Sequence, residues 1–264
     1  MTDCKKHRII KTENLTIGYA SKQVNKAVAS SININLNAGE LIGLIGGNGI
    51  GKSTLLRTLT QVQPPLDGKI FIKEKPISHY TAINLAKVMS LVLTDKTASK
   101  NLSVLELVTL GRYPYTNWVG RLTQKDKDAV NQALKLTDIE DLKLKKCFEL
   151  SDGQLQRVML ARALAQDTDI IILDEPTTHL DMYHKAHILK LLKTLAKNTN
   201  KTILFSSHEI DLAIQLCNKL VVMTDKEVVC DTPSNLINTG VFETLFPKNL
   251  IYFDKTSKSF KVNK

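Results

Sequence analysis

A glycine-rich run is the feature of this sequence with the clearest chemistry. Glycine fills four of its first six positions, so the backbone can wrap closely around a phosphate while successive N–H groups point inward. Lys52 would then reach the β- and γ-phosphates, Ser53 would bind Mg²⁺, and Thr54 would support the α/β-phosphate. A turn that binds nothing is the alternative, and the helix predicted directly after the run disfavours it. The run consists of Gly46, Gly47, Asn48, Gly49, Ile50, Gly51, Lys52, Ser53 and Thr54.

A pair of acids, Asp174 and Glu175, follows an apolar run that predicts a buried strand. The carboxyl end of such a strand faces the sheet edge where ligands bind, which is also the edge that the glycine-rich run reaches. Asp174 can hold Mg²⁺, usually through water, and Glu175 can orient or deprotonate a water that attacks a phosphate. Two merely solvated acids are the alternative, but their place after a phosphate-binding run favours catalysis.

A histidine at the end of the next predicted strand, His208, is a third candidate. It could hydrogen-bond the γ-phosphate and the attacking water, and hold Glu175 in place. A single histidine after a strand is more often a surface residue, but its order after the acid pair favours a catalytic role. His184 and His187 share one predicted helix face near Asp181, and a metal site there is disfavoured because it lacks further ligands.

Alternating strands and helices must position these groups. A continuous apolar run before the glycines predicts a buried strand, and leucines at helical spacing after them predict a helix. The same alternation continues around the acid pair and His208, which favours an α/β fold with a mostly parallel sheet covered on both faces. The predicted strands are 31–36, 40–45, 69–72, 169–173, 202–205 and 220–223, and the predicted helices here are 52–60 and 188–195.

A helical segment interrupts this alternation. Apolar residues at helical spacing predict three helices, at 104–110, 130–136 and 155–164. We therefore expect one domain over residues 1–264, with a helical subdomain inserted at about 95–166. The roughly forty residues after the strand at 220–223 suit a small hairpin, a helix and a terminal strand.

The composition limits the class of protein. The chain has 264 residues, 43% hydrophobic residues and a formal net charge of +10. Its lysines are spread along the whole chain, so we expect a solvated surface and no nucleic-acid partner. The N-terminus lacks a signal peptide, and no apolar run approaches the ~18 residues of a membrane span, which predicts a cytoplasmic protein. The four cysteines form no CxxC pair, which favours reduced thiols.

A further run names a family. Leu150 is followed by Ser151, Asp152, Gly153 and Gln154 at the start of a predicted helix, and this resembles the LSGGQ signature of ABC-type ATPases. Asp174, Glu175 and Asp181 resemble that family's Walker B segment and D-loop, and His208 resembles its switch histidine. Tyr19 is similar to the aromatic residue that stacks on adenine. These motifs cover nearly the whole chain in family order.

The resemblance implies a fold and a mechanism. The fold is that of a P-loop NTPase of the ABC ATPase type, with a mostly parallel sheet core, a small antiparallel β region and the inserted helical subdomain. Two copies of the chain would form a homodimer around two ATP molecules. The signature of one subunit, residues 151–154, and Asp181 would act in trans on the ATP of the other, with the helix N-terminus facing the γ-phosphate. Glu175, His208 and Lys52 would be the catalytic residues, and ATP and Mg²⁺ the ligands.

Two departures from the family pattern stand out. Asp152 replaces the first glycine of the signature pair, a negative charge that is favourable near a helix N-terminus. The family also has a glutamine that touches Mg²⁺ and signals to the permease, but no glutamine occurs between Gln63 and Gln124. We hypothesise that either Thr94 or Asp95 takes over this role and serves Mg²⁺ or its water through oxygen.

The segment at 111–118, Gly-Arg-Tyr-Pro-Tyr-Thr-Asn-Trp, narrows the resemblance. It is similar to the ATP-binding subunits of iron-siderophore, heme and cobalamin importers, where this region presses against the permease. Its aromatics suit a protein interface, although a packed loop is the alternative. The implied protein is peripheral on the inner face of the cell membrane, binds integral membrane permease subunits, and works indirectly with an extracytoplasmic substrate-binding protein.

Two other classes remain open at this stage. A soluble ABC-type ATPase that works on nucleic acid, ribosomes or cluster assembly would not be coupled to transport. Such proteins often have two fused cassettes or a long coiled coil, and this chain has one cassette and no sustained heptads. An exporter domain is disfavoured because no membrane segment is fused to the cassette.

Overall fold

The computed structural model describes residues 8–20, 25–93, 101–247 and 249–263. Two compact units divide the chain. The first unit combines Met1–His79 with Thr202–Lys264, and the second unit is Tyr80–Lys201. Within the described ranges, no helix combines the length and the apolar character that crossing a membrane takes.

An antiparallel sheet opens the first unit. Its strand order is β2-β1-β5-β6, and β3 also pairs with β1. The strand predicted at 31–36 is split in two, because β2 ends at Ile32 and β3 begins at Asn35. Between them the Asn33 side chain accepts a hydrogen bond from the backbone N–H of Asn14 at 2.9 Å, and Ser31 just before has a left-handed φ of 55°. The strands are β1 (Arg8–Tyr19), β2 (Lys26–Ile32), β3 (Asn35–Asn37), β5 (Asp67–Ile72) and β6 (Lys75–Pro76).

A second group of strands in the first unit runs mostly parallel, in the order β11-β10-β4-β9. β4 pairs in parallel with both β9 and β10, and only β11 is antiparallel to its neighbour. Every residue of β4 and of β9 is buried, as expected for central strands covered on both faces. The strands are β4 (Leu41–Gly46), β9 (Thr202–Ser206), β10 (Lys219–Met223) and β11 (Val228–Asp231).

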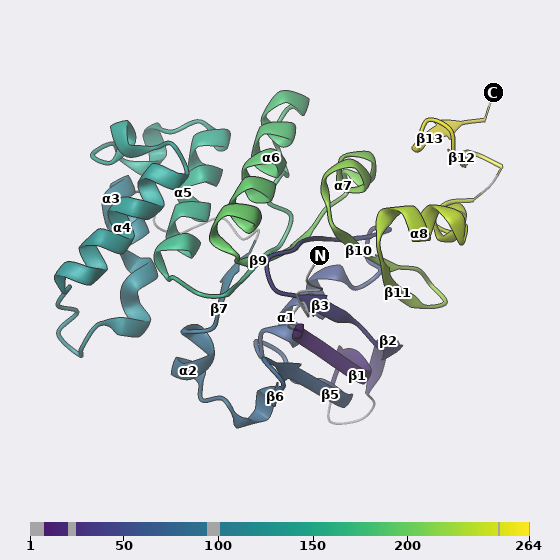
Figure 1. Ribbon diagram of the computed structural model, residues 1–264, viewed down its shortest axis with the longest axis horizontal. Helices are drawn as coiled ribbons and strands as arrows, with labels where there is room; N and C mark the ends of the chain where they lie inside the picture. Colours follow the sequence, from purple (N-terminus) through teal and green to yellow (C-terminus); the bar gives the residue numbers. More distant parts are fainter. Residues whose placement is uncertain (1–7, 21–24, 94–100, 248, 264) are drawn as a thin grey trace, which may run out of the picture. The chain divides into compact units, whose positions relative to one another are not determined.

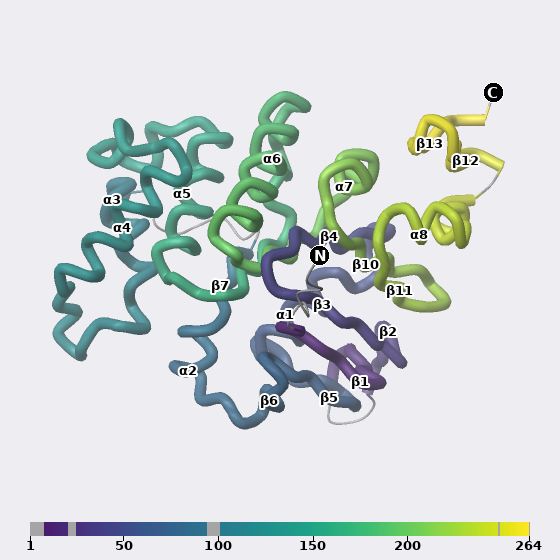
Figure 2. Tube along the Cα trace, in the orientation of Figure 1, coloured from purple at the N-terminus to yellow at the C-terminus, as the bar shows by residue number. Residues whose placement is uncertain are grey.

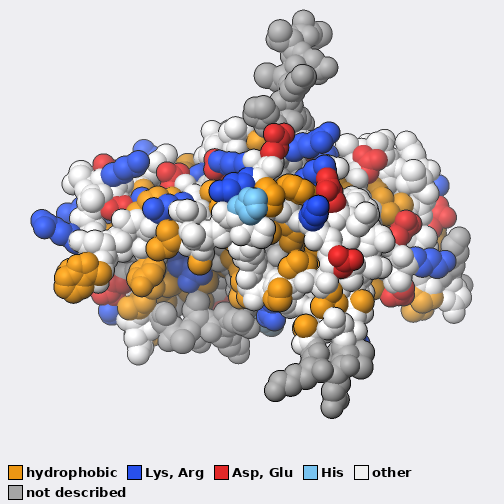
Figure 3. Space-filling view, turned by 90° about the horizontal axis from the view of Figure 1, so that it is seen from below, with side chains coloured by type: hydrophobic (Ala, Val, Ile, Leu, Met, Phe, Trp, Pro, Cys, Tyr) orange, Lys and Arg blue, Asp and Glu red, His pale blue; other side chains and the backbone are white. Residues whose placement is uncertain are grey.

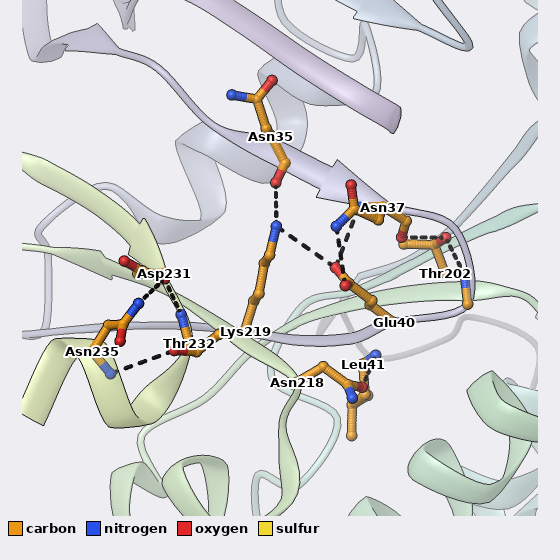
Figure 4. Close-up of polar contacts among 11 residues, drawn as sticks. Asn35, Asn37, Glu40, Leu41, Thr202, Asn218, Lys219, Asp231, Thr232 and Asn235 are labelled. Carbon is orange, nitrogen blue, oxygen red and sulfur yellow. Dashed lines mark hydrogen bonds and ion pairs between the residues drawn. The ribbon is translucent and has the colours of Figure 1, made fainter. Parts of the chain in front are cut away.

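A polar cluster aligns the beginnings of these strands (Figure 4). The carboxylate of Glu40, only 3% exposed, accepts hydrogen bonds from the backbone and side chain of Asn37 at 3.3 and 3.0 Å. The ammonium group of Lys219, at the start of β10, lies 3.8 Å from Glu40 and donates to a backbone carbonyl at 3.0 Å. Asn218 accepts from the first amide of β4, and Thr202 at the start of β9 accepts from Gly39.

The remaining elements of the first unit are short (Figure 1). The C-terminal part is a helix and a hairpin, in which the rings of Phe242 and Phe253 lie 5.0 Å apart and those of Phe246 and Phe260 also 5.0 Å apart. The elements are α1 (Lys52–Leu59), α7 (Ile210–Leu216), α8 (Pro233–Asn238), β12 (Ile251–Asp254), β13 (Ser259–Val262) and the 3₁₀ turns Ile77–His79 and Val241–Thr244.

Among its described residues, the second unit contains the parallel strand pair of β7 and β8. Helices α2 to α6, labelled in Figure 2, also belong to this unit. Helices α3, α4 and α5 lie within the range predicted as a helical subdomain at about 95–166, and the boundaries of that subdomain stay a prediction. The elements are α2 (Ala82–Ala86), β7 (Met89–Val92), α3 (Val104–Thr109), α4 (Gln124–Leu136), α5 (Asp152–Ala165), β8 (Ile170–Leu173), α6 (Met182–Thr199) and the 3₁₀ turns Leu110–Tyr115, Glu140–Leu142 and Cys147–Glu149.

A buried ion pair fastens the helical part of the second unit. The guanidinium of Arg112 contacts Asp126 through Nε at 2.9 Å and Nη2 at 2.8 Å, and its Nη1 donates to the carbonyl of Ala165 at 2.7 Å. Asp126 also accepts from the backbone and hydroxyl of Thr123, the N-cap of α4. These bonds connect the turn after α3 to the start of α4 and the end of α5.

We predict that Asp126→Asn destabilises the chain by about 3 kcal/mol or more, because it leaves the buried Arg112 charge without its partner. The hydrogen bonds from Thr123, followed by those from Arg112, hold the pKa of the Asp126 carboxyl below its ordinary value. The stability that this carboxylate contributes is therefore complete above its unfolded pKa of about 4, and is lost as the pH falls through the lower folded value. Urea unfolding at several pH values measures both effects.

The matched control is Asp128→Asn, because Asp128 is an exposed carboxylate on the same helix. It should change stability by no more than about 0.5 kcal/mol and leave the acid dependence unaltered. An Asp126→Asn variant that unfolds in acid with the same slope as the unaltered protein would contradict the assignment.

Candidate functional site

The glycine-rich run joins β4 to α1 in the first unit. Gly46 ends β4, and Gly51 is the N-cap of α1 with a left-handed φ of 110°. Gly51 offers no side-chain cap, and the first turn of α1 has no acidic residue. The positive end of this helix is therefore not neutralised by a carboxylate of its own first turn, which suits an anionic ligand.

Lys52 is buried at the base of this loop, with only 5% of its surface exposed. Its ammonium group donates to the carbonyl oxygens of Gly46 and Gly47, both at 3.0 Å. Ser53 is half-buried and Thr54 buried in the first turn of the helix. The loop thus places a positive charge and two hydroxyl groups beside a helix N-terminus. These are the groups that bind the phosphates of a nucleotide in a P-loop.

Tyr19 is tied to the same loop. It ends β1, is 53% exposed, and its hydroxyl lies 3.1 Å from Oγ1 of Thr54. This hydrogen bond fixes one edge of the ring beside the first turn of α1 while much of the ring stays open to solvent. The arrangement is compatible with the proposed stacking of Tyr19 on adenine.

His208 and the glycine-rich run both lie at the carboxyl end of the first unit's parallel strands. The backbone N–H of Ser207 donates to the carbonyl of Leu44 at 3.0 Å, so the end of β9 stays paired with β4 just before the loop. Ser207 then accepts from the N–H of Glu209 at 2.9 Å, and the carbonyl of His208 accepts from Ile210 at 3.0 Å. These bonds turn the chain at His208 and leave that residue exposed.

We predict that two glycines of the loop differ in what they contribute. A Cβ at Gly51 would stand 2.4 Å from Val28 at a φ of 110°, so Gly51→Ala should destabilise the chain by about 1–3 kcal/mol. A Cβ at Gly47 meets nothing within 4 Å, so Gly47→Ala should change stability by no more than about 0.5 kcal/mol. Gly47→Ala should nonetheless weaken ATP binding, because a phosphate needs close approach to the backbone. Thermal unfolding and ATP titration separate the two effects, and equal losses of stability would contradict this difference.

We also predict that the ring of Tyr19 matters more than its hydroxyl. Tyr19→Ala should weaken binding of a non-hydrolysable ATP analogue by about tenfold, since base–aromatic stacking contributes about 1–3 kcal/mol. Tyr19→Phe keeps the ring that would stack and removes only the bond to Thr54, which lies within the protein and not to the nucleotide, so ATP binding should stay within about threefold of the unaltered protein. Tyr252→Ala, at another exposed tyrosine of the first unit, is the control. Equal losses in the Ala and Phe variants would count against stacking.

The acid pair lies in the second unit, directly after β8. Asp174 is buried, 6% exposed, and its backbone N–H donates to Val92 at 2.8 Å, continuing the strand pair. Glu175 adopts a left-handed φ of 49°, and its carboxylate accepts a hydrogen bond from the Thr178 hydroxyl at 3.0 Å. A non-glycine residue in this conformation is strained, and such strain gathers at functional sites. The strain was not visible in the sequence.

The signature run starts α5. Ser151 is the N-cap: its hydroxyl accepts from the N–H of Gln154 at 3.3 Å, and the Gln154 side chain accepts from the N–H of Ser151 at 3.1 Å. Asp152 is the acidic residue of the first turn and is exposed. The sequence predicted this helix start, and the reciprocal capping box explains why it lies at Ser151.

Asp181 caps the next helix, α6, in the same way. Its carboxylate accepts from the backbone N–H of His184 at 2.9 Å and from ring Nδ1 of His184 at 2.9 Å. The hydrogen bond from the His184 backbone is the main reason that the pKa of Asp181 lies below its ordinary value, followed by the bond from the ring. Asp181 therefore stays ionised at neutral pH.

The candidate residues divide between the two units. The first unit carries Tyr19, the glycine-rich run and His208, and the second unit carries Asp174, Glu175, the signature run and Asp181. Thr94 and Asp95 lie outside the described residues. In the described ranges, His, Cys, Asp and Glu side chains nowhere gather in a group of three that could hold a metal ion. Ser53 and Asp174 offer the oxygen donors that Mg²⁺ prefers, so their chemistry fits this ion.

The sequence analysis considered His184 only as a possible metal ligand and missed its hydrogen bond to Asp181 and its place beside the signature glycine, Gly153. Its position three residues after a helix-capping aspartate is the signal that could have found it.

The chain matches a known family model over residues 29–178, whose description is "ABC transporter". It is 38% identical to an uncharacterised ABC transporter ATP-binding protein of Methanocaldococcus jannaschii, over 92% of this chain and 83% of that protein. It is 34% identical to the achromobactin transport ATP-binding protein CbrD of Dickeya dadantii, over 90% of this chain and 87% of that protein.

Solved structures show the same fold. An ABC transporter of metal-chelate type in an inward-facing conformation matches with a TM-score of 0.77 and 28% identity, over 91% of this chain and 89% of that chain. A dimeric ATP-binding cassette bound to ADP and Pi in a post-hydrolysis state matches with a TM-score of 0.72 and 27% identity, over 85% of this chain and 99% of that chain. The predicted fold class is confirmed.

Proposed function

The chain belongs to the family of ABC transporter ATP-binding proteins, and we propose that it energises the import of an iron chelate through a separate membrane permease. It is an ATP-binding, ATP-hydrolysing subunit of this family. The family assignment made from the sequence is confirmed. The proposal concerns the cargo, the partners, the place in the cell and the roles of individual residues.

The observation that carries the proposal is that several relatives that match most of the chain are named as transport or import proteins of this kind. Relatives at 32–34% identity include transport or import ATP-binding proteins for achromobactin, petrobactin and ferric enterobactin. Each of these matches covers at least 90% of this chain. An iron–siderophore complex is therefore the proposed cargo, ahead of heme or cobalamin.

The proposed reaction is the attack of water on the γ-phosphate of ATP to give ADP and phosphate. Lys52, held against the loop carbonyls, would neutralise charge on the β- and γ-phosphates. Glu175 would orient and deprotonate the water, and His208 would hydrogen-bond the γ-phosphate. Mg²⁺, held by Ser53 and by Asp174 through water, would supply charge neutralisation of the phosphate oxygens. Whether Thr94 or Asp95 adds an oxygen ligand stays a prediction.

We further propose that two copies form a homodimer in the ATP-bound state. Residues 151–154 and Asp181 of one copy would then contact the ATP of the other. The helix N-terminus of α5, with Ser151 as its cap, is suited to a γ-phosphate because its amide groups and hydroxyl can donate to phosphate oxygens. The dimeric cassette with ADP and Pi supports the homodimer.

An exposed apolar segment of the second unit is the proposed contact with the permease. Tyr113 is 77%, Trp118 97% and Val119 65% exposed. Figure 3 shows exposed hydrophobic side chains on one face of the molecule, among them a group at its left. Aromatic residues are enriched in protein interfaces, and the buried Arg112–Asp126 pair gives this segment a rigid base. The proposed place is the inner face of the cell membrane. A substrate-binding protein on the outer side would take part only through the permease.

Glu175→Gln tests the proposal. The variant should bind ATP but hydrolyse it at least about a hundredfold more slowly, because the water loses its base. It should therefore trap the closed dimer. A tagged variant, purified with ATP and Mg²⁺ from detergent-solubilised native membranes, should retain a polytopic permease that mass spectrometry identifies.

Two controls sharpen this experiment. Glu209→Gln removes a carboxylate next to His208 and should neither trap a dimer nor retain the permease. Trp118→Ala together with Glu175→Gln should still dimerise with ATP but lose the permease. Ribosomal or assembly proteins in place of a permease would favour the soluble ATPase machine instead.

A further inference from the structure

The first turn of α6 carries a cluster of rings beside the signature helix. Tyr183 and His184 meet edge to face with ring centroids 5.4 Å apart, and Tyr183 stacks on His187 at 6.3 Å. Together with Gly153 and Arg157 of α5, these residues line a cavity of about 140 Å³. All of them belong to the second unit, so the cluster is a local feature of one folded body.

His184 grips the Asp181 carboxylate from two directions. Its backbone N–H donates to Oδ1 at 2.9 Å, as a helix cap does, and its ring Nδ1 lies 2.9 Å from both Oδ1 and Oδ2. Because a carboxylate only accepts, Nδ1 carries the hydrogen in this contact. His184 therefore makes the main contacts that fix the orientation of the Asp181 side chain, and the Tyr183 backbone adds to them.

The other edge of the same ring lies against the signature. A Cβ added to Gly153 would stand 3.0 Å from Cδ2 of His184 and 3.6 Å from Cγ. The ring thus occupies space that a side chain at residue 153 would need. A larger residue there would have to push the ring away from α5.

We propose that His184 is a positioning residue that fixes Asp181 and the signature run at a constant separation within each subunit. The inference rests on the proposed function, in which both segments contact the nucleotide of the other copy. If two segments that must contact the same ATP move independently, they are seldom in the reactive geometry together, and ATP hydrolysis is slower. A ring that is bonded to one segment and packed against the other joins them into one rigid surface.

Other groups around the ring do not replace it. The Arg157 guanidinium donates to the carbonyl of Asp138 at 2.9 Å and lies 3.6 Å from its carboxylate. Tyr183 stacks its ring on His187, one turn further along α6. Among the described contacts, His184 is the residue that reaches both Asp181 and Gly153.

The first experiment measures hydrogen exchange of the full chain without nucleotide. His184→Ala should lose amide protection over residues 151–155 while the melting temperature stays unchanged, because His184 is half exposed and outside the core. His187→Ala, the matched control on the same helix face, should leave this protection intact. Unchanged exchange in His184→Ala, or an equal loss in His187→Ala, would overturn the inference. This readout does not depend on ATP hydrolysis.

The second experiment measures steady-state ATP hydrolysis by the same variants. His184→Ala should lower kcat by about tenfold or more, with KM for ATP unchanged, because P-loop binding is intact while the trans contacts are displaced. His184→Asn should recover part of kcat, since its amide can still donate to Asp181. A raised KM with kcat unchanged, or no rescue by asparagine, would contradict positioning. Absence of hydrolysis by the unaltered chain would instead count against the proposed function, and the exchange experiment would still decide the role of His184.

Discussion

The buried carboxylate of Glu40 is the interaction on which the phosphate-binding end of the first unit depends. It binds Asn37 and lies near Lys219, so the segments that lead into β4 and β10 are fastened together before either strand begins. Thr202 joins β9 to the same cluster. Neighbouring parallel strands of similar length that begin at the same level also end at the same level, because each residue advances a strand by about 3.3 Å. The loop after Gly46 and the turn at His208 therefore lie at the same end of these strands, their carboxyl end.

Helix N-termini supply most of the remaining chemistry. Gly51 leaves the start of α1 without a side-chain cap, whereas Ser151 and Asp181 cap α5 and α6 with their own oxygens. A cap occupies one acceptor atom and leaves the hydroxyl hydrogen of Ser151 available for donation to an anion. The same residue can thus stabilise its helix and, in the proposed dimer, face a phosphate. The residue that starts helix α5 is thus also one that the proposed function requires.

Three residues of this arrangement adopt a strained backbone conformation or bury a charge, and both are energetically unfavourable. Glu175 holds a left-handed φ of 49°, and Gly51 a φ of 110° that other residues rarely adopt. Arg112 is 2% exposed, and its charge is compensated by Asp126, by the Ala165 carbonyl and by the Tyr115 ring 4.0 Å from the guanidinium. Each of these features fixes a segment that the proposed function needs in one place: the acid after β8, the phosphate loop and the exposed aromatic segment.

The sequence by itself determined the local elements. The run from Gly46 to Thr54 predicts a loop and a helix because each part follows from neighbouring residues, and the signature run marks where α5 begins. The start of α6 was missed, because apolar spacing predicted a helix only at 188–195 whereas α6 begins at Met182. Only the tertiary structure decided the contacts between residues distant in sequence. The bond from Tyr19 to Thr54, the Arg112–Asp126 pair and the packing of His184 on Gly153 depend on how elements pack, which no local pattern encodes. The break at residues 33–34 belongs with them, because the apolar alternation of the sequence continues through these residues while β2 ends at Ile32 and β3 begins at Asn35.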